Sequence, residues 1–224
     1  NNLDRSVTYV IADLLAENQI LRSLDLAYNN LGDDGISNLA SVLATQNTVL
    51  EEIRCRSSYA ILVLVFDLTE MLFDFHSFAY NNVGSTGATA IARAIRMSKC
   101  LEVVNIIGNN FTQEDSSMLM EAIEQSTCFR SLLGLPKLAS IADLSGRGMK
   151  TADLIMLSTE LQHNKNIAVL DLRDNSIHPK TVSNLVAILQ STTSLTACDF
   201  SGSDSENTNV LGAEGLFELA QALR

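Results

Sequence analysis

The sequence predicts an α/β solenoid, a horseshoe-shaped stack of repeats with parallel strands on its concave face and helices on its convex face. Three observations predict it. Segments recur mostly at intervals of 28 residues, one half of each segment alternates apolar and polar residues, and the other half has apolar residues at helical spacing. One strand and one helix cannot bury their own apolar faces, but stacked copies can. We therefore expect residues 1–224 to form a single repeat domain.

The strand half of the unit reads LxxLxLxxNxL, as in residues 21–31, LRSLDLAYNNL. Its leucines alternate, so they point to one face of a short strand. The Asn offers an amide that can satisfy backbone groups of the turn after the strand, and Arg or Ser does this less well. We therefore expect looser repeats where Arg or Ser replaces it. The equivalent positions, separated by 28, 52, 28, 38, 28 and 28 residues, are Asn1, Asn29, Asn81, Asn109, Arg147, Asn175 and Ser203.

The helix half of the unit has apolar residues at positions i, i+3, i+4 and i+7, which form one stripe along a helix. A glycine precedes the stripe in three repeats, at Gly35, Gly87 and Gly215, where a turn enters the helix with little room for a side chain. The clearest stripes are Ile36, Leu39, Ala40 and Leu43, then Ala88, Ile91, Ala92 and Ile95, then Val182, Leu185, Val186 and Leu189.

With this period and motif, almost the whole chain resembles the ribonuclease-inhibitor-like leucine-rich repeats. The resemblance implies a non-catalytic protein-interaction module, as in NOD-like receptors and ciliary adaptors. The turns LGDDG at 31–35 and LGAEG at 211–215 look like those of the Ran GTPase-activating protein. This likeness implies an alternative function, activation of a Ran-like small GTPase without an arginine finger. Tropomodulin repeats are similar too, but no actin-binding helix precedes the repeats in this sequence.

One repeat is interrupted by residues 55–77, which separate LEEIR at 50–54 from FAYNN at 78–82. Joining the two flanks restores an ordinary unit, so we expect an insertion that splits a strand. It can be a genuine insert that packs against a neighbour, or an element for dimerisation or for binding a membrane surface. We favour a third hypothesis, a short intron retained in frame in the coding sequence, because the flanks rejoin so cleanly.

The interval from Asn109 to Arg147 is ten residues longer than the usual repeat. Within it, residues 129–137, FRSLLGLPK, look like a degenerate strand whose Pro136 would interrupt strand pairing. We expect a loop that bulges between repeats. A second loop is expected at residues 203–210, after the last strand.

Composition argues against several functional classes. The net charge of −11 argues against nucleic acid and against an anionic membrane, and favours a partner with a basic surface or a charged small protein. The acidity can equally serve solubility alone, and a small GTPase as partner is what the resemblance implies. The four cysteines form no CxxC pair, which is typical of free thiols in the reducing cytoplasm. The three histidines are scattered, so we expect no catalytic residues, no metal site and no cofactor. The chain starts and stops within repeats, and we expect it to be a fragment.

The candidate binding surface is the concave face, to which the middle residue of each strand should point. Consecutive Asp residues would form an acidic ladder there, partly neutralised by an Arg, and a basic partner would relieve their repulsion. Asp is also common at this position of the repeat, so the ladder can be an ordinary solvated surface. The predicted surface contains Asp25, Glu52, Arg54, Asn105, Asp143, Asp171, Arg173 and Asp199.

A second candidate is an apolar patch on one inner strand. Val103 and Ile107 flank Asn105 there, and two exposed apolar side chains can anchor a partner. They can equally be ordinary surface residues.

Overall fold

The computed structural model of the chain describes residues 3–18, 20–21, 24, 26, 28–45, 80–99, 101–135, 138–203 and 208–222. Its elements follow the predicted order of helix and strand in the second half of the chain. The helices are α1 (Arg5–Glu17), α2 (Gly32–Thr45), α3 (Ser85–Met97), α4 (Gln113–Gln125), α5 (Thr151–His163), α6 (Val182–Ser191) and α7 (Gly212–Ala222), with the 3-10 helix η1 (Pro179–Thr181) before α6. The strands are β1 (Ile141–Asp143), β2 (Val169–Asp171) and β3 (Ala197–Asp199).

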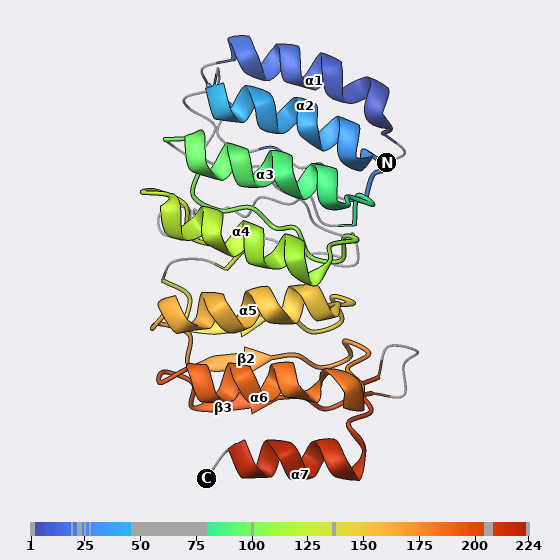
Figure 1. Ribbon diagram of the computed structural model, residues 1–224, viewed down its shortest axis with the longest axis vertical. Coiled ribbons are helices and arrows are strands. Elements are labelled where there is room, and N and C mark those ends of the chain that lie inside the picture. The colour runs from blue at the N-terminus through green and yellow to red at the C-terminus, as the bar shows by residue number, and fades with distance from the viewer. Residues whose placement is uncertain are drawn as a thin grey trace, which may run out of the picture.

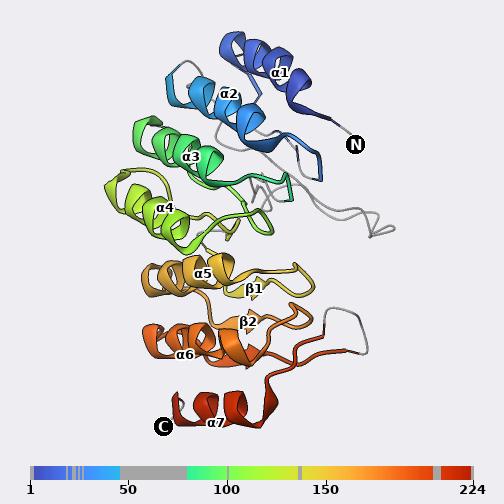
Figure 2. The same ribbon diagram turned by 45° about the vertical axis from the view of Figure 1, so that its right-hand side comes forward.

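The helices stack in chain order in one column, from α1 at one end to α7 at the other (Figure 1). The strands lie on one side of this column (Figure 2). They pair in parallel in the order β1-β2-β3, in a register that places Ile141 beside Val169 and Val169 beside Ala197. Mixed helices and parallel strands of this kind form an α/β leucine-rich-repeat fold.

The predicted helical stripes form the core between the helices and the strands. The first two stripes are buried throughout, and in the third Val182 and Leu185 are buried while Val186 and Leu189 pack against the cluster. The glycine positions are as crowded as expected: a Cβ on Gly87 would lie 2.2 Å from Cγ1 of Val83. The helix half of the unit is therefore confirmed.

Where an Asn follows the strand half of the unit, it ties one repeat to the next. The side-chain oxygen of Asn109 accepts the N–H groups of Asn81 and Val83, both at 3.0 Å, and its Nδ2 donates to the carbonyl of Ile106 at 2.9 Å. Asn175 repeats this pattern, because its oxygen accepts the N–H of Met149 at 3.1 Å. The predicted role of the Asn is confirmed for these repeats.

In the last repeat the prediction of Ser203 was wrong, because Asn209 takes this position. The side-chain oxygen of Asn209 accepts the N–H groups of Asn175 and Ile177, at 2.9 and 3.0 Å. The additional polar residues therefore precede the Asn instead of following it. Spacing alone pointed to Ser203, whereas the amide of Asn209 makes the hydrogen bonds that a Ser hydroxyl cannot reproduce.

Between Asn109 and Arg147, the degenerate strand expected at 129–137 is confirmed for residues 129–135, which therefore do not form the expected bulge. Residues 129–135 run beside residues 102–106, where the N–H of Val104 donates to the carbonyl of Ser131 at 2.8 Å and that of Ile106 to Leu132 at 3.0 Å. Their apolar side chains are buried, with Leu132 fully covered. The additional residues are thus a further layer of the core. The predicted insertion at 55–77 lies outside the described residues.

Candidate functional site

The strand side of the C-terminal repeats carries a column of three aspartates. Strand register places Asp143 beside Asp171 and Asp171 beside Asp199, as the ladder requires. Neighbouring strands lie about 4.8 Å apart, so the three carboxylates are close enough to repel one another. Asp143 and Asp199 are exposed and Asp171 is half-buried. The predicted arrangement of these three side chains is present.

Each aspartate also shapes the turn that follows its strand. The carboxylate accepts the backbone N–H two residues further on: Asp143 from Ser145 at 3.1 Å and Asp199 from Ser201 at 2.9 Å. Asp171 accepts from Arg173 in the same way, at 3.0 Å. Such local bonds are a common reason for Asp at a turn. The column therefore has a structural role in addition to its charge.

Arg173 neutralises the centre of the column. Its Nε lies 3.0 Å from both carboxylate oxygens of Asp171 and 3.5 Å from a carboxylate oxygen of Asp199. The side-chain hydrogen bond from Arg173 holds the pKa of Asp171 below its ordinary value, and Asp171 in turn raises the pKa of Arg173. One guanidinium faces three carboxylates, so the surface keeps a net negative charge, with Asp143 furthest from compensation.

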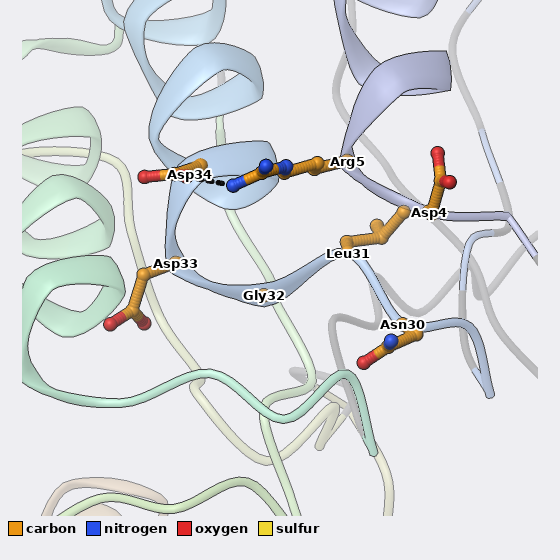
Figure 3. A pocket seen from close by; sticks show the side chains of 7 residues that line it. All are labelled: Asp4, Arg5, Asn30, Leu31, Gly32, Asp33 and Asp34. Carbon is orange, nitrogen blue, oxygen red and sulfur yellow. Dashed lines mark hydrogen bonds and ion pairs between the residues drawn. The ribbon is translucent and has the colours of Figure 1, made fainter.

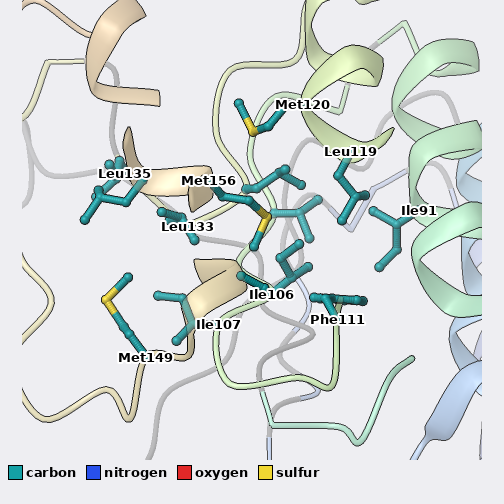
Figure 4. Packing of buried hydrophobic residues seen from close by; sticks show 14 of the residues in the cluster. Ile91, Ile106, Ile107, Phe111, Leu119, Met120, Leu133, Leu135, Met149 and Met156 are labelled. Atoms are coloured by element: carbon teal, nitrogen blue, oxygen red, sulfur yellow. The ribbon is translucent and has the colours of Figure 1, made fainter. Parts of the chain in front are cut away.

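The predicted patch of Val103, Asn105 and Ile107 was wrong as a surface. Val103 and Asn105 are each 9 % exposed, and Ile107 is 1 % exposed. Val103 forms a bridge with Ser131, and Ile107 lies in the core near Leu133 and Met149 (Figure 4). The segment 129–135 provides this additional cover, so these side chains are unavailable to a partner.

Two tyrosines that the sequence did not suggest form part of the surface near the N-terminal repeats. The rings of Tyr28 and Tyr80 stack with centroids 4.7 Å apart, and Tyr28 is 42 % exposed. Both have positive φ, 53° and 54°, where Gly108 and Gly146 occupy the equivalent position of later repeats. Burial raises the pKa of Tyr80. The repeated AYNN of residues 27–30 and 79–82 is the signal that points to them.

A hollow of about 340 Å³ lies where α1 meets α2 (Figure 3). Arg5 and Asp34 form an exposed ion pair across it at 3.1 Å. Asp33 turns away toward α3, where it accepts the N–H groups of Gly84 and Gly87 at 2.6 and 3.1 Å. Its side chain therefore holds the start of α3 against α2. In the part of the chain that the structure describes, no group of three or more His, Cys, Asp or Glu residues is arranged to hold a metal ion.

Three predicted surface residues, Asp25, Glu52 and Arg54, lie outside the described residues. The surface that the structure brings together is therefore Asp143, Asp171, Arg173 and Asp199. None of the helices in the described ranges is long and apolar enough to cross a membrane.

A family model described as Leucine Rich repeat matches residues 17–40, which contain the end of α1, the strand half of a unit and the start of α2. The chain is also 22 % identical over 219 residues to NACHT, LRR and PYD domains-containing protein 4E of Mus musculus. These matches support a leucine-rich-repeat chain of the ribonuclease-inhibitor type. That alignment covers 95 % of this leucine-rich-repeat chain and 19 % of the mouse protein, so the chain spans about a fifth of its relative.

Two solved structures are similar to this chain at low identity. The C-terminal domain of tropomodulin from Caenorhabditis elegans is 13 % identical to this chain, with a TM-score of 0.41. The superposition includes 96 % of this chain and 90 % of the tropomodulin chain. The leucine-rich-repeat-containing protein LegL7 from Legionella pneumophila is 16 % identical to this chain, with a TM-score of 0.45. The superposition includes 95 % of this chain and 66 % of the LegL7 chain.

Proposed function

We propose that the protein is a non-catalytic scaffold that binds another protein through the concave face of a curved, horseshoe-shaped solenoid. The observation that carries this proposal is the column Asp143, Asp171 and Asp199, aligned on adjacent strands with a single Arg173 among them. Repeat stacks offer a broad, rigid surface in place of a deep pocket, which suits a protein partner better than a small substrate.

The partner's surface should be basic where it meets the column. A cationic side chain near Asp143 would reduce the repulsion that the column carries and would speed association. Arg173 illustrates the chemistry, because its guanidinium contacts both Asp171 oxygens. We place the protein in the cytoplasm, in keeping with the free thiols of Cys128 and Cys198.

The test is affinity capture with matched charge variants. Bait carrying Asp143→Asn and Asp199→Asn should lose a partner that wild-type bait retains. Bait carrying Glu121→Gln and Glu124→Gln, exposed on α4 of the helical side, should retain that partner. Added salt should release the partner from wild-type bait, because exposed charges are screened.

Equal retention by both double variants would refute a role for the aspartate column. Recovery of a nucleotide-loaded small GTPase would favour the alternative function, a GTPase-activating protein for a Ran-like GTPase, and a hydrolysis assay would then decide between activation and simple binding.

A further inference from the structure

The last unit of the stack is less covered than the units before it. It consists of β3 and α7 and lies at one end of the stack (Figure 1). The first apolar residue of the helical stripe is fully buried in three earlier helices, where it is Ile36, Ala88 and Val182. The residue at this place in α7, directly after Gly215, is Leu216, and it is 57 % exposed. A stripe position that is buried in earlier units is therefore open in the last one.

The strand of this unit shows the same contrast. The two core residues of the preceding strand segment are Leu170 and Leu172, and both are fully buried. Their equivalents in the last unit, Cys198 and Phe200, are only half-buried. β3 packs beside β2, whereas β3 is the end strand of its sheet in the part of the chain that the structure describes. The difference in burial thus follows from the strand that comes next in the stack.

β3 also directs backbone groups to the edge where the sheet ends. On its other edge, the carbonyls of Asp199 and Ser201 accept the N–H groups of Leu172 and Asp174, at 2.8 and 3.3 Å. Successive residues of a parallel strand direct their backbone groups to opposite neighbours. The N–H and carbonyl of Cys198 are therefore directed away from β2. An edge of this kind can pair with a further strand.

An apolar cavity lies between this strand and the helices. It has a volume of about 600 Å³, and α6, β3 and α7 all contribute to its walls. In the earlier units the leucines that follow one another along a strand belong to the buried core. A strand added beside β3 would place its alternate side chains in the corresponding space. The apolar residues around this cavity include Leu189, Leu195, Cys198, Phe200, Leu211 and Leu216.

The register of the sheet indicates which charge the added strand should carry. Asp143, Asp171 and Asp199 stand at the same place of three paired strands. The residue of an added strand at this place would lie about 4.8 Å from Asp199. The side chain of Asp199 is 51 % exposed and shares the guanidinium of Arg173 with Asp171. A Lys or Arg of the added strand would complement this carboxylate.

We propose that the end of the stack formed by β3 and α7 accepts an extended segment of a partner protein as an additional parallel strand. The segment has apolar residues at alternate positions, whose side chains enter the cavity, and a Lys or Arg between them, beside Asp199. Main-chain hydrogen bonds supply affinity in such strand addition, and pockets for alternate side chains supply specificity. This contact is at the edge of the sheet, so it is separate from the concave-face contact proposed above.

A second copy of this chain is a poorer occupant than a segment of another protein. Apolar residues of the strand halves are buried in the copy's own stack, among them Leu26, Leu144 and Leu170. They are thus unavailable to pair with β3 of another molecule. Each copy also carries a net charge of −11, so two copies repel one another.

A synthetic peptide tests the site on the whole chain. Its sequence is that of residues 167–175, IAVLDLRDN, and it carries Asp171→Lys. It should bind saturably in a fluorescence titration, and the amide resonances of Cys198 and Phe200 should shift on binding. The peptide with the unchanged Asp171 should bind roughly 3- to 10-fold more weakly, because two carboxylates would then be adjacent. A peptide of the same composition without alternating apolar residues should not bind.

Two variants of the chain locate the contact. Cys198→Pro removes an N–H that is directed to the open edge and should weaken binding about 10-fold, while the bonds between β2 and β3 remain. Leu216→Asp adds a charge beside the apolar cavity and should weaken binding about 10-fold or more. The matched control is Leu14→Asp, since Leu14 is 64 % exposed on α1 at the other end of the stack, and it should bind as wild type. Circular dichroism verifies that each variant is folded.

Asp199→Asn separates this contact from the concave-face binding. It should keep the peptide bound but remove the preference for lysine, because the carboxylate beside the added strand is lost. A preference that persists in Asp199→Asn would refute the register of the added strand.

The proposal is overturned if the lysine peptide fails to bind the wild-type chain. It is also overturned if Cys198→Pro and Leu216→Asp bind as tightly as wild type, or if Leu14→Asp weakens binding to the same extent. Sedimentation of the wild-type chain without peptide completes the test. Self-association that Leu216→Asp abolishes would assign the end of the stack to a second copy and would overturn the proposal of a partner protein.

Discussion

Replacing Asn109 with alanine should be among the most destabilising single changes in this chain. The side chain is 2 % exposed, and its amide accepts two backbone N–H groups of the preceding repeat and donates to one carbonyl of its own. Alanine leaves all three groups buried without this partner. Each unsatisfied buried group costs about 1–3 kcal/mol, and entering water recovers part of that, so we expect a total loss of about 3–5 kcal/mol.

Urea unfolding followed by circular dichroism measures this loss, provided that the slope of the free energy of unfolding against urea concentration is the same in wild type and variant. Asn110→Ala is the matched control, because Asn110 is exposed and, among the described residues, its amide bonds to the side chains of Asn82 and Lys150. It should cost less than about 1 kcal/mol. A loss below about 1 kcal/mol for Asn109→Ala would refute the assignment of the Asn as the link between repeats.

Two further predictions concern the strand-side surface. Tyr28→Gly removes a half-exposed ring but also relieves a positive φ that costs an L-residue about 1–2 kcal/mol. The free energy of unfolding should therefore change by less than about 1 kcal/mol, while Tyr80→Gly, which removes the more buried ring of the stack, should lose more in the same urea titration. Arg173→Ala should raise the pKa of Asp171 toward its ordinary value, measured by the pH titration of its carboxyl carbon resonance. Because the lowered pKa of Asp171 stabilises the fold above its ordinary titration range and is lost as the pH falls, wild type and Arg173→Ala should converge in stability at acidic pH.

The sequence by itself determined the repeating unit and most of its core. A stripe such as Ile36, Leu39 and Leu43 is buried because helical spacing alone places its members on one face. The position of Asp143, Asp171 and Asp199 on adjacent strands follows from a period of 28 residues in the same way. These features depend only on local geometry and on copies that stack identically.

Tertiary structure alone decided which departures from the period matter. Ile107 and Arg173 are equivalent in the repeat, yet Ile107 is buried in the core near Leu133 and Met149, whereas Arg173 is exposed and pairs with Asp171 and Asp199. Glu160 is placed among helix residues with nothing in its spacing to distinguish it, yet it is buried and accepts the N–H groups of Leu132 and Leu133. Burial and hydrogen bonding at such positions depend on which segments meet in space, and a periodic pattern does not contain that information.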